Sequence, residues 1–180
     1  MSWWWIRYDL HVSKQLVVAV TGASGPVYAQ AFCRALLAAG GRIPLVFSKA
    51  AIGVIHEETG IQMGSPEVWV ERFLGGVSDR VTLYGAEQMH SRLASGSFRH
   101  DGMCVIPCSI GRLGSIASGL SRDLIDRAAE VTMKEGRKLV LVPRETPLSP
   151  IALENMLKLS RAGVSILPAM PAFYTHPKTL

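Results

Sequence analysis

The chain has 180 residues, of which 48% are hydrophobic and 18% are charged, a balance that excludes a disordered chain and indicates one globular domain. Its formal net charge is +5, but the basic residues form no run or patch, so the charge points to small anions such as phosphates rather than to nucleic acid. No apolar run reaches the about 18 residues of a membrane helix, and three cysteines without metal-ligand spacing indicate a reducing cytoplasm, with neither a metal site nor a disulfide framework.

The first 14 residues do not fit the pattern of the rest. They include Trp3, Trp4 and Trp5 in succession, which indicate either a surface anchor or a mis-assigned start. The apolar stretch is too short and wrongly flanked for a signal peptide. We therefore treat residues 1–14 as an N-terminal extension and residues 15–180 as the domain.

Strand-like and helix-like segments alternate along the domain. Short β-branched runs that stop at Gly or Pro indicate buried strands, and helical spacing that ends at Gly indicates helices. In chain order we expect a strand over 16–20, a helix over 26–39, a strand over 43–47, helices over 49–59 and 66–74, a strand over 80–84, a loop over 85–101, a strand over 103–106, helices over 111–118 and 122–135, a strand over 138–142, a helix over 149–162 and a strand over 164–167.

This alternation predicts an α/β fold: a single-domain, doubly wound parallel sheet, flavodoxin-like or Rossmann-like, in a three-layer sandwich. Ligands bind such sheets outside the carboxyl ends of the strands. Five separate segments follow predicted strands and therefore converge on that edge, namely Thr21-Gly22, Ser48, residues 107–109, Arg144-Glu145 and residues 168–174.

The turn after the first strand suits a phosphate. Gly22, Ala23, Ser24 and Gly25 place small residues and bare backbone N–H groups at the positive end of the next helix. The two glycines permit unusual φ angles and a close approach, and the serine adds a hydroxyl. The turn lacks the lysine of a P-loop and the full dinucleotide fingerprint, so a plain tight turn without a ligand stays open.

Two residues of the second helix have an ordinary explanation beside a functional one. Ser48 follows the second strand and is placed to cap the helix that starts there. Glu58 lies near the end of that helix, where the dipole disfavours a carboxylate. This conflict indicates another use, although an exposed glutamate remains the simpler interpretation.

Cys108 and Ser109 follow the strand over 103–106. A cysteine nucleophile needs a base, and none can be named, so we expect Cys108 to be a buried structural thiol. Ser109 is placed to cap the next helix.

Charged residues gather in the later half of the domain. Arg127 and Lys134 are seven residues apart and share a helix face. Asp123 stands four residues before Arg127, which predicts a surface ion pair. Beyond the next strand, Arg144 and Glu145 lie in a loop stiffened by prolines, and the arginine suits bidentate phosphate binding.

The segment over 168–174 combines two prolines with Phe173 and Tyr174. It forms either a rigid apolar wall with one hydroxyl at the ligand edge or a simple hydrophobic cap over the sheet.

Together these motifs resemble the flavin prenyltransferases, a family formerly described as aromatic or phenylacrylic acid decarboxylases. The similarity covers roughly residues 15–180, and the later half is the more specific. The segments that carry it are 20–28, 95–97, 107–109, 127–129, 134–135, 139–147, 153–159 and 171–174.

The resemblance implies a flavodoxin-like homo-oligomer, a dodecamer built from trimers, that requires no metal. Such enzymes transfer a dimethylallyl group from dimethylallyl phosphate to N5 and C6 of reduced FMN. The product, prenylated FMN, serves a separate decarboxylase.

The family's functional residues map onto this chain by motif. The resemblance implies FMN binding by Gly22, Ala23, Ser24, Ser48, Ser109, Ile110, Gly111, Arg112 and Arg144. It implies a substrate-phosphate site made by Lys134, Arg144 and Tyr174, partly across a subunit interface. It implies catalytic roles for Ser24, Glu58, Arg127, Lys134 and Glu145, with Glu58 in proton transfer near N5.

Two departures from the family are visible. The family has Lys-Thr where this chain has Gly111-Arg112, so a phosphate-binding hydroxyl is missing, and Arg112 either compensates by its charge or fills the phosphate pocket. The chain ends at Leu180, whereas family members continue into a further helix that supplies another arginine, so we expect a truncated C-terminus.

Two other functions remain open. A related FMN-dependent cysteine decarboxylase would need a catalytic histidine, for which His56 is only a loose candidate, and a Pro-x-Met-Asn-type motif that Asn155-Met156 does not supply. A non-catalytic FMN-binding protein would bind flavin without turnover, as the truncated end and Arg112 would allow.

Overall fold

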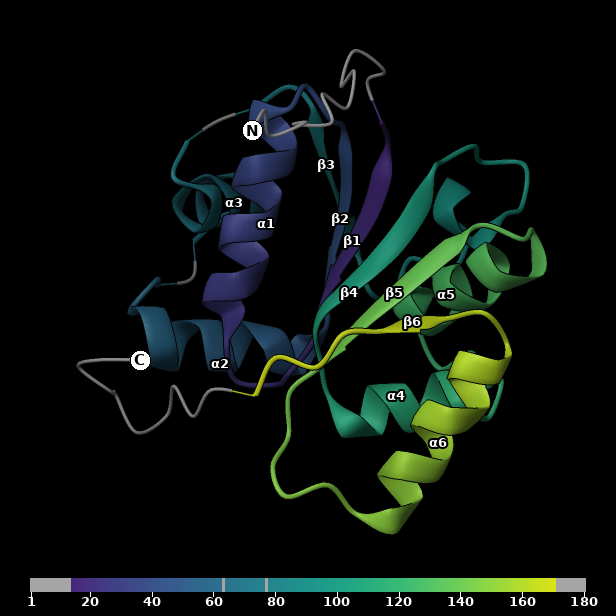
Figure 1. Ribbon diagram of the computed structural model, residues 1–180. Coiled ribbons are helices and arrows are strands. Elements are labelled where there is room, and N and C mark those ends of the chain that lie inside the picture. The colour runs from purple at the N-terminus through teal and green to yellow at the C-terminus, as the bar shows by residue number, and fades with distance from the viewer. Residues whose placement is uncertain (1–13, 63, 77, 171–180) are drawn as a thin grey trace, which may run out of the picture.

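The computed structural model describes residues 14–62, 64–76 and 78–170 (Figure 1). In these ranges the strands form one parallel sheet of six strands in the order β3-β2-β1-β4-β5-β6. The strands are β1 Leu16–Val20, β2 Ile43–Phe47, β3 Val81–Gly85, β4 Gly102–Cys108, β5 Lys138–Pro143 and β6 Ser165–Ile166.

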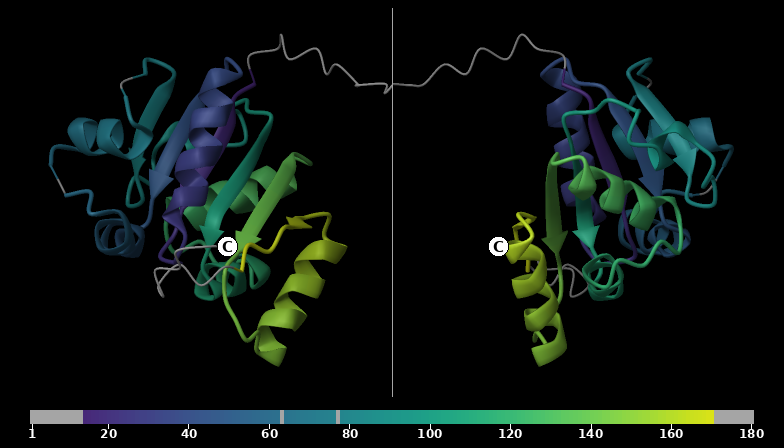
Figure 2. Two further views of the ribbon diagram at one scale, coloured as in Figure 1. Left: turned by 60° about the vertical axis from the view of Figure 1, so that its left-hand side comes forward. Right: turned by 90° about the vertical axis from the view of Figure 1, so that its right-hand side faces the viewer.

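Helices cover both faces of this sheet (Figure 2). They are α1 Pro26–Ala38, α2 Lys49–Thr59, α3 Pro66–Leu74, α4 Ile110–Ala117, α5 Leu124–Lys134 and α6 Pro150–Arg161, with a short 3₁₀ helix over Arg92–Ala94. The first three pack on one face and the last three on the other, so the sheet is the middle layer of three. The predicted doubly wound α/β class is confirmed.

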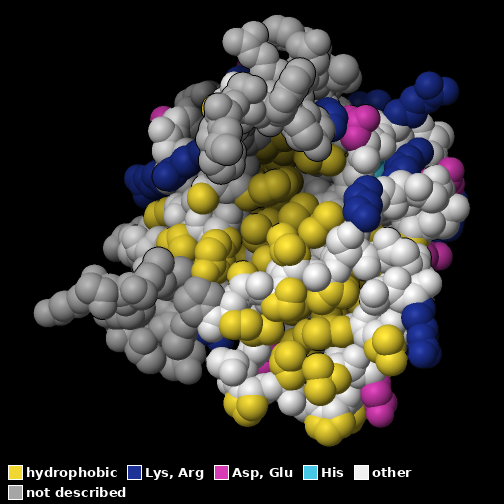
Figure 3. Space-filling model, in the orientation of Figure 1, with side chains coloured by type: hydrophobic (Ala, Val, Ile, Leu, Met, Phe, Trp, Pro, Cys, Tyr) yellow, Lys and Arg dark blue, Asp and Glu magenta, His cyan; other side chains and the backbone are white. Residues whose placement is uncertain are grey.

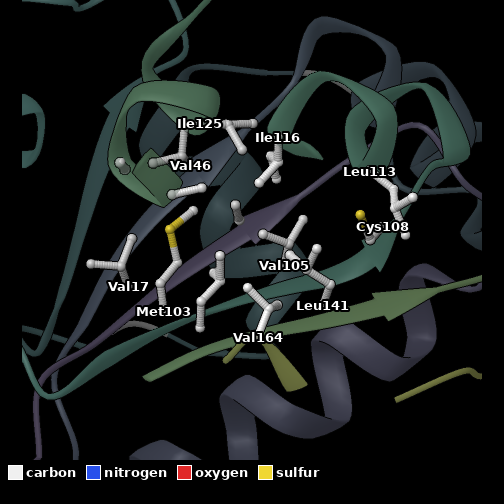
Figure 4. Packing of buried hydrophobic residues seen from close by; sticks show 14 of the residues in the cluster. Val17, Val46, Met103, Val105, Cys108, Leu113, Ile116, Ile125, Leu141 and Val164 are labelled. Atoms are coloured by element: carbon white, nitrogen blue, oxygen red, sulfur yellow. The ribbon is translucent and has the colours of Figure 1, made fainter. Parts of the chain in front are cut away.

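Alternate residues of the central strands contribute side chains to two hydrophobic cores, one on each face of the sheet. Val18 and Val20 face α1, α2 and α3 and pack with side chains such as Phe73. Val17 and Ala19 face the other way, toward the core under α4 and α5 (Figure 4). Because both faces are covered, these strands are apolar throughout, which is why they read as continuous β-branched runs in the sequence.

The strand order decides between the two expected layouts. The order 3-2-1-4-5-6 is the Rossmann arrangement, whereas the flavodoxin arrangement would place β3 beside β1. The order reverses between β1 and β4, and this is the switch point where such sheets bind their ligands.

Several predicted boundaries were wrong in detail. β4 continues through Pro107 to Cys108, with a register shift against β5 that accommodates the missing proline N–H. The predicted loop over 85–101 contains the 3₁₀ turn Arg92–Ala94, and the last strand is limited to Ser165–Ile166. In the ranges that the structure describes, no helix is long and apolar enough to cross a membrane.

Candidate flavin-phosphate site

The start of α1 differs from the start of every other α-helix in the described ranges. The helices α2, α3, α4 and α6 begin at Ser48, Ser65, Ser109 and Ser149, whose hydroxyls accept a backbone N–H, and α5 begins at Asp123, which does the same. α1 begins at Gly25, in the left-handed conformation with φ 97°, and has no side-chain cap. Pro26 at the first position of α1 has no N–H and the N–H of Tyr28 donates to the carbonyl of Gly25, so donors for an anion come from the loop before α1 rather than from this first turn.

Gly22 allows the loop before α1 to lie directly against α2. A Cβ at this position would come 2.5 Å from the Cβ of Ala50, which is far inside normal contact distance. Only two small residues can meet there, and their contact brings the loop after β1 beside the first turn of α2.

Ser24 carries an unused hydroxyl in this loop. Its Oγ is buried and has no hydrogen-bond partner among the residues that the structure describes. Buried hydroxyls are nearly always paired, so an unpaired one beside an uncapped helix start marks a place for a ligand acceptor.

Thr21 joins the loop to β4, a role that the sequence reasoning missed. Its hydroxyl donates to the carbonyl of Pro107 at 2.7 Å and accepts the backbone N–H of Ser109 at 2.8 Å. The residue is 2% exposed. A threonine at the end of a buried strand was the one sequence feature that pointed to this role. Its partner Ser109, however, lies 88 positions away, so the contact cannot be inferred from sequence spacing.

Ser48 and Ser109 stand at the neighbouring helix starts. Ser48 Oγ accepts the N–H of Ala51 at 3.1 Å, and Ser109 Oγ accepts the N–H of Arg112 at 3.3 Å. Both caps were predicted. Each hydroxyl can still donate its own proton, so both are compatible with a phosphate oxygen. Ile110 and Gly111 form the first turn of α4 beside them.

Glu58 reaches back to the same loop from the far end of α2. Its Oε2 accepts the backbone N–H of Gly25 at 2.9 Å. The unfavourable position of this carboxylate at the end of α2 is thus explained by a bond to the start of α1, and the alternative of a simply exposed glutamate was wrong.

The side chain of Arg112 points to partners that the sequence reasoning did not consider. Its Nη1 and Nη2 donate to Asp123 at 2.6 Å each, and Nη1 also donates to Asp126. Neither sequence-based alternative holds for this guanidinium, because it is bound to two carboxylates instead of facing a phosphate. The predicted pair of Asp123 with Arg127 was wrong for the same reason, and Arg127 pairs with Glu130 at 2.8 Å.

Arg127 and Lys134 lie away from the loop after β1. Arg127 Nε donates to the carbonyl of Ala94 at 3.2 Å, and Lys134 pairs with Glu135 beside Gly96. Lys134 is near the start of β5, at the amino edge of the sheet, a strand length of ~20 Å from the loop. One copy of the chain therefore does not bring these two cations to the loop.

Arg144 and Glu145 follow β5 at the carboxyl edge. Arg144 is buried and its N–H donates to the carbonyl of Cys108, which ties this loop to the end of β4. Glu145 is exposed. Tyr174 lies outside the described residues, as does the rest of the segment after Met170.

Cys108 has no catalytic character. It is fully buried beside Leu113 (Figure 4), and burial raises the pKa of its thiol to about 12. Its expected structural role is confirmed. In the described ranges no group of three or more His, Cys, Asp or Glu residues could hold a metal ion.

The residues present fit the phosphate of a flavin mononucleotide. Three features meet at the switch point of the sheet: an uncapped helix start, a buried unpaired hydroxyl, and a loop that can lie against α2 only because residue 22 is a glycine. Fold and site together define a Rossmann-type α/β protein that binds a phosphorylated ligand.

Comparisons with known proteins agree with this class. The family model described as Flavoprotein matches residues 7–178. The flavin prenyltransferase UbiX of Halalkalibacterium halodurans is 44% identical over 163 residues, 91% of this chain and 79% of the relative. The chain belongs to the Flavoprotein family and, within it, to the flavin prenyltransferases.

Solved structures lead to the same family. The crystal structure of AnUbiX (PadA1), described as a complex with FMN and dimethylallyl pyrophosphate, is 42% identical with a TM-score of 0.78, and the match covers 94% of this chain and 85% of that one. A dodecameric FMN-dependent UbiX-like decarboxylase from Escherichia coli O157:H7 is 44% identical with a TM-score of 0.76, over 92% and 85% of the two chains.

Proposed function

We propose that this protein is a flavin prenyltransferase that uses FMN and transfers a dimethylallyl group from dimethylallyl phosphate to the reduced flavin. The observation that carries the proposal is the uncapped, glycine-dependent loop before α1 in a chain more than 40% identical to named flavin prenyltransferases. The solved relative described with FMN and dimethylallyl pyrophosphate supports the substrate class.

The flavin phosphate is held at the carboxyl edge of β1, β2 and β4. Gly22 and Ser24 offer backbone N–H groups and the unpaired hydroxyl, and Ala23 lies between them with its own N–H donated to the carbonyl of Thr21. Ser48 and Ser109 offer two further hydroxyls from the starts of α2 and α4. Ile110, Gly111 and Arg112 contribute the first turn of α4, and Arg112 takes part through its backbone only. Arg144 supplies the nearby positive charge.

Reduced FMN, when bound, supplies the N5 and C6 atoms to which the dimethylallyl group is joined as phosphate leaves. Glu58 is held at the loop by the N–H of Gly25 and serves as the proton acceptor for this transfer. Lys134, Arg144 and Tyr174 would surround the departing phosphate together with Glu145, and the two cations and the tyrosine hydroxyl would offset the negative charge that it gains. Arg127 fixes the loop at Ala94 through its bond to that carbonyl.

A complete site needs a second copy of the chain. Lys134 stands at the opposite edge of the sheet from the loop, so the lysine that serves one flavin comes from a neighbouring subunit. Ile151, Leu153 and Leu157 of α6 are 69%, 51% and 52% exposed. Figure 3 shows hydrophobic side chains gathered in a band over the face that carries β6 and α6, as expected for a surface that other copies cover. The dodecameric relative supports assembly into a dodecamer, which we propose to be built from trimers.

In the cell the product passes to a separate decarboxylase, and both proteins share the cytoplasm. The three buried cysteines agree with a reducing compartment.

An anaerobic assay tests the activity. The protein is incubated with FMN, a reductant and dimethylallyl phosphate, and the flavin is analysed by mass. We expect a flavin heavier by one C5H8 unit, with release of inorganic phosphate. Flavin binding without a mass change would leave only an FMN-binding protein, and decarboxylation of a cysteine substrate in a parallel incubation would favour the cysteine decarboxylase alternative.

A further inference from the structure

A buried ion cluster joins the start of α4 to the start of α5. Arg112 on α4 is 8% exposed, and the side chain of Asp126 on α5 is fully buried. The guanidinium binds Asp123 through both terminal nitrogens and binds Asp126 through one of them. Ser115 Oγ donates to the other oxygen of Asp126 at 2.6 Å, so both helices are tied by several bonds at one point.

The cluster has no net charge. Arg112 and Arg122 supply two positive charges, and Asp123 and Asp126 supply two negative ones. Arg122 approaches Asp126 from the solvent side and is 52% exposed, whereas Arg112 approaches from the protein interior. A guanidinium held in this way contributes little attraction to a phosphate, although it lies one helical turn from Ser109.

Arg112 also belongs to the turn that faces the flavin phosphate. Its backbone N–H donates to Ser109 Oγ, and the N–H of Ser109 donates to Thr21 at the end of β1. A displacement of Arg112 therefore moves the first turn of α4 relative to the loop over residues 21–25.

We propose that Arg112 is a positioning residue for FMN, which it serves through Asp123 and Asp126 by fixing the first turn of α4 and by neutralising two carboxylates near the phosphate. This inference rests on the proposed flavin site. Loss of the guanidinium has two effects: the α4 start is released, and the cluster, in which only Arg122 then offsets Asp123 and Asp126, gains a net negative charge close to the turn that faces a dianion.

The test is a charge-rescue experiment on FMN affinity, measured by quenching of flavin fluorescence on the apo-protein. We expect Arg112→Met to weaken FMN binding by about tenfold or more, because the cluster then carries a net negative charge that opposes the phosphate and no longer fixes the first turn of α4. Adding Asp126→Asn should restore about threefold or more of the loss, since the double variant keeps one positive charge, Arg122, and one negative charge, Asp123, and so has no net charge.

Two further variants keep the test decisive. Arg112→Lys retains the charge but cannot bind both carboxylates as a fork, so we expect a folded protein with an intermediate loss. Arg122→Met removes the exposed partner of the same carboxylate, and we expect FMN affinity within about twofold of the wild type because water replaces that bond. Thermal unfolding of each apo-protein separates a loss of fold from a loss of affinity.

Two results would overturn the inference. If the double variant binds FMN as poorly as Arg112→Met, the guanidinium acts on the phosphate by direct contact and not through the two carboxylates. If Arg112→Met and Arg112→Lys bind FMN like the wild type, the cluster serves stability alone. A wild-type protein that binds no FMN would instead refute the proposed function, and this control is measured first.

Discussion

The hydroxyl of Thr21 accepts the backbone N–H of Ser109 at 2.8 Å and donates to the carbonyl of Pro107 at 2.7 Å. One side chain thus joins the end of β1 to the end of β4, on the two sides of the point where the strand order reverses. The phosphate loop and the start of α4 are held in register by this contact, and Thr21 itself needs no contact with the ligand.

Replacing Thr21 by valine should separate the two strand ends. Valine has the same shape but leaves a buried N–H and a buried carbonyl without this partner, which costs about 1–3 kcal/mol of unfolding free energy. Urea denaturation should show this loss, and FMN affinity should fall with it. Thr21→Ser keeps the hydroxyl and should retain most of both; equal damage from the two substitutions would contradict the role assigned to the hydroxyl.

Gly22→Ala should prevent normal FMN binding without unfolding the sheet. The new Cβ would lie 2.5 Å from the Cβ of Ala50, so the loop must move away from α2. We expect FMN affinity to fall by tenfold or more, equivalent to about 1.4 kcal/mol.

Two variants control this prediction. Gly53→Ala lies on the same helix as Ala50, where an added Cβ meets nothing within 4 Å, and it should leave FMN affinity unchanged. Ala50→Gly in the Gly22→Ala background removes the clashing atom and should restore affinity. Failure of this second change to help would show that the contact with Ala50 does not set the loop.

Glu58 has both a structural bond and a proposed proton-transfer role, which two substitutions can separate. Glu58→Gln keeps an oxygen that can accept the N–H of Gly25 but removes the ionisable group, so we expect normal folding and FMN binding with little product. Glu58→Ala should in addition destabilise the start of α1 by about 1 kcal/mol. Glu57→Gln, on the exposed neighbour, serves as the control, and full activity in Glu58→Gln would remove the catalytic assignment.

The cluster around Asp126 should make stability sensitive to acid. Burial opposes ionisation of Asp126, but hydrogen bonds from Ser115, Arg122 and Arg112 outweigh it and lower the pKa below its ordinary value of 3.8. A carboxyl with a lowered folded-state pKa stabilises the protein fully above its unfolded-state pKa, and this contribution is lost as the pH falls through the folded-state pKa.

Unfolding free energy should therefore decline as the pH drops below about 4, and the decline should be shallower in Asp126→Asn. Urea denaturation at several pH values measures both slopes. Parallel pH profiles for the two proteins would mean that other carboxyls govern the acid response.

Charges on α6 should disrupt assembly. Leu153→Lys with Leu157→Lys places two cations on a surface that is half exposed in one copy, and burial of unpaired charges between copies is strongly unfavourable. We expect smaller particles in analytical ultracentrifugation and loss of product formation, with an unchanged circular dichroism spectrum. Glu154→Lys, an exposed change on the same helix, should leave the particle size unaltered.

The parts of the molecule that depend on local pattern were predictable from sequence. Apolar runs located every strand, and serines before helices marked Ser48 and Ser109 correctly as caps. The Rossmann strand order was not predictable, because alternation of strands and helices is the same in both layouts and only long-range packing decides between them.

The contacts that complete the site could not be predicted from the sequence either. Glu58 binds Gly25 across 33 positions, and Arg112 binds Asp126 across a turn between two helices, so neither follows from helical spacing. The spacing of four between Asp123 and Arg127 even favoured the wrong partner, since the buried guanidinium of Arg112 competes for Asp123 more effectively than the half-buried one of Arg127.

The unpaired hydroxyl of Ser24 also bears on which flavin the protein can select. Riboflavin has the same ring system as FMN but ends in an alcohol, which would leave that hydroxyl without an anionic acceptor. Buried donors left without an acceptor penalise the poorer ligand far more than a missing apolar contact does. We therefore expect the protein to discriminate between riboflavin and FMN at the end of the ribityl tail.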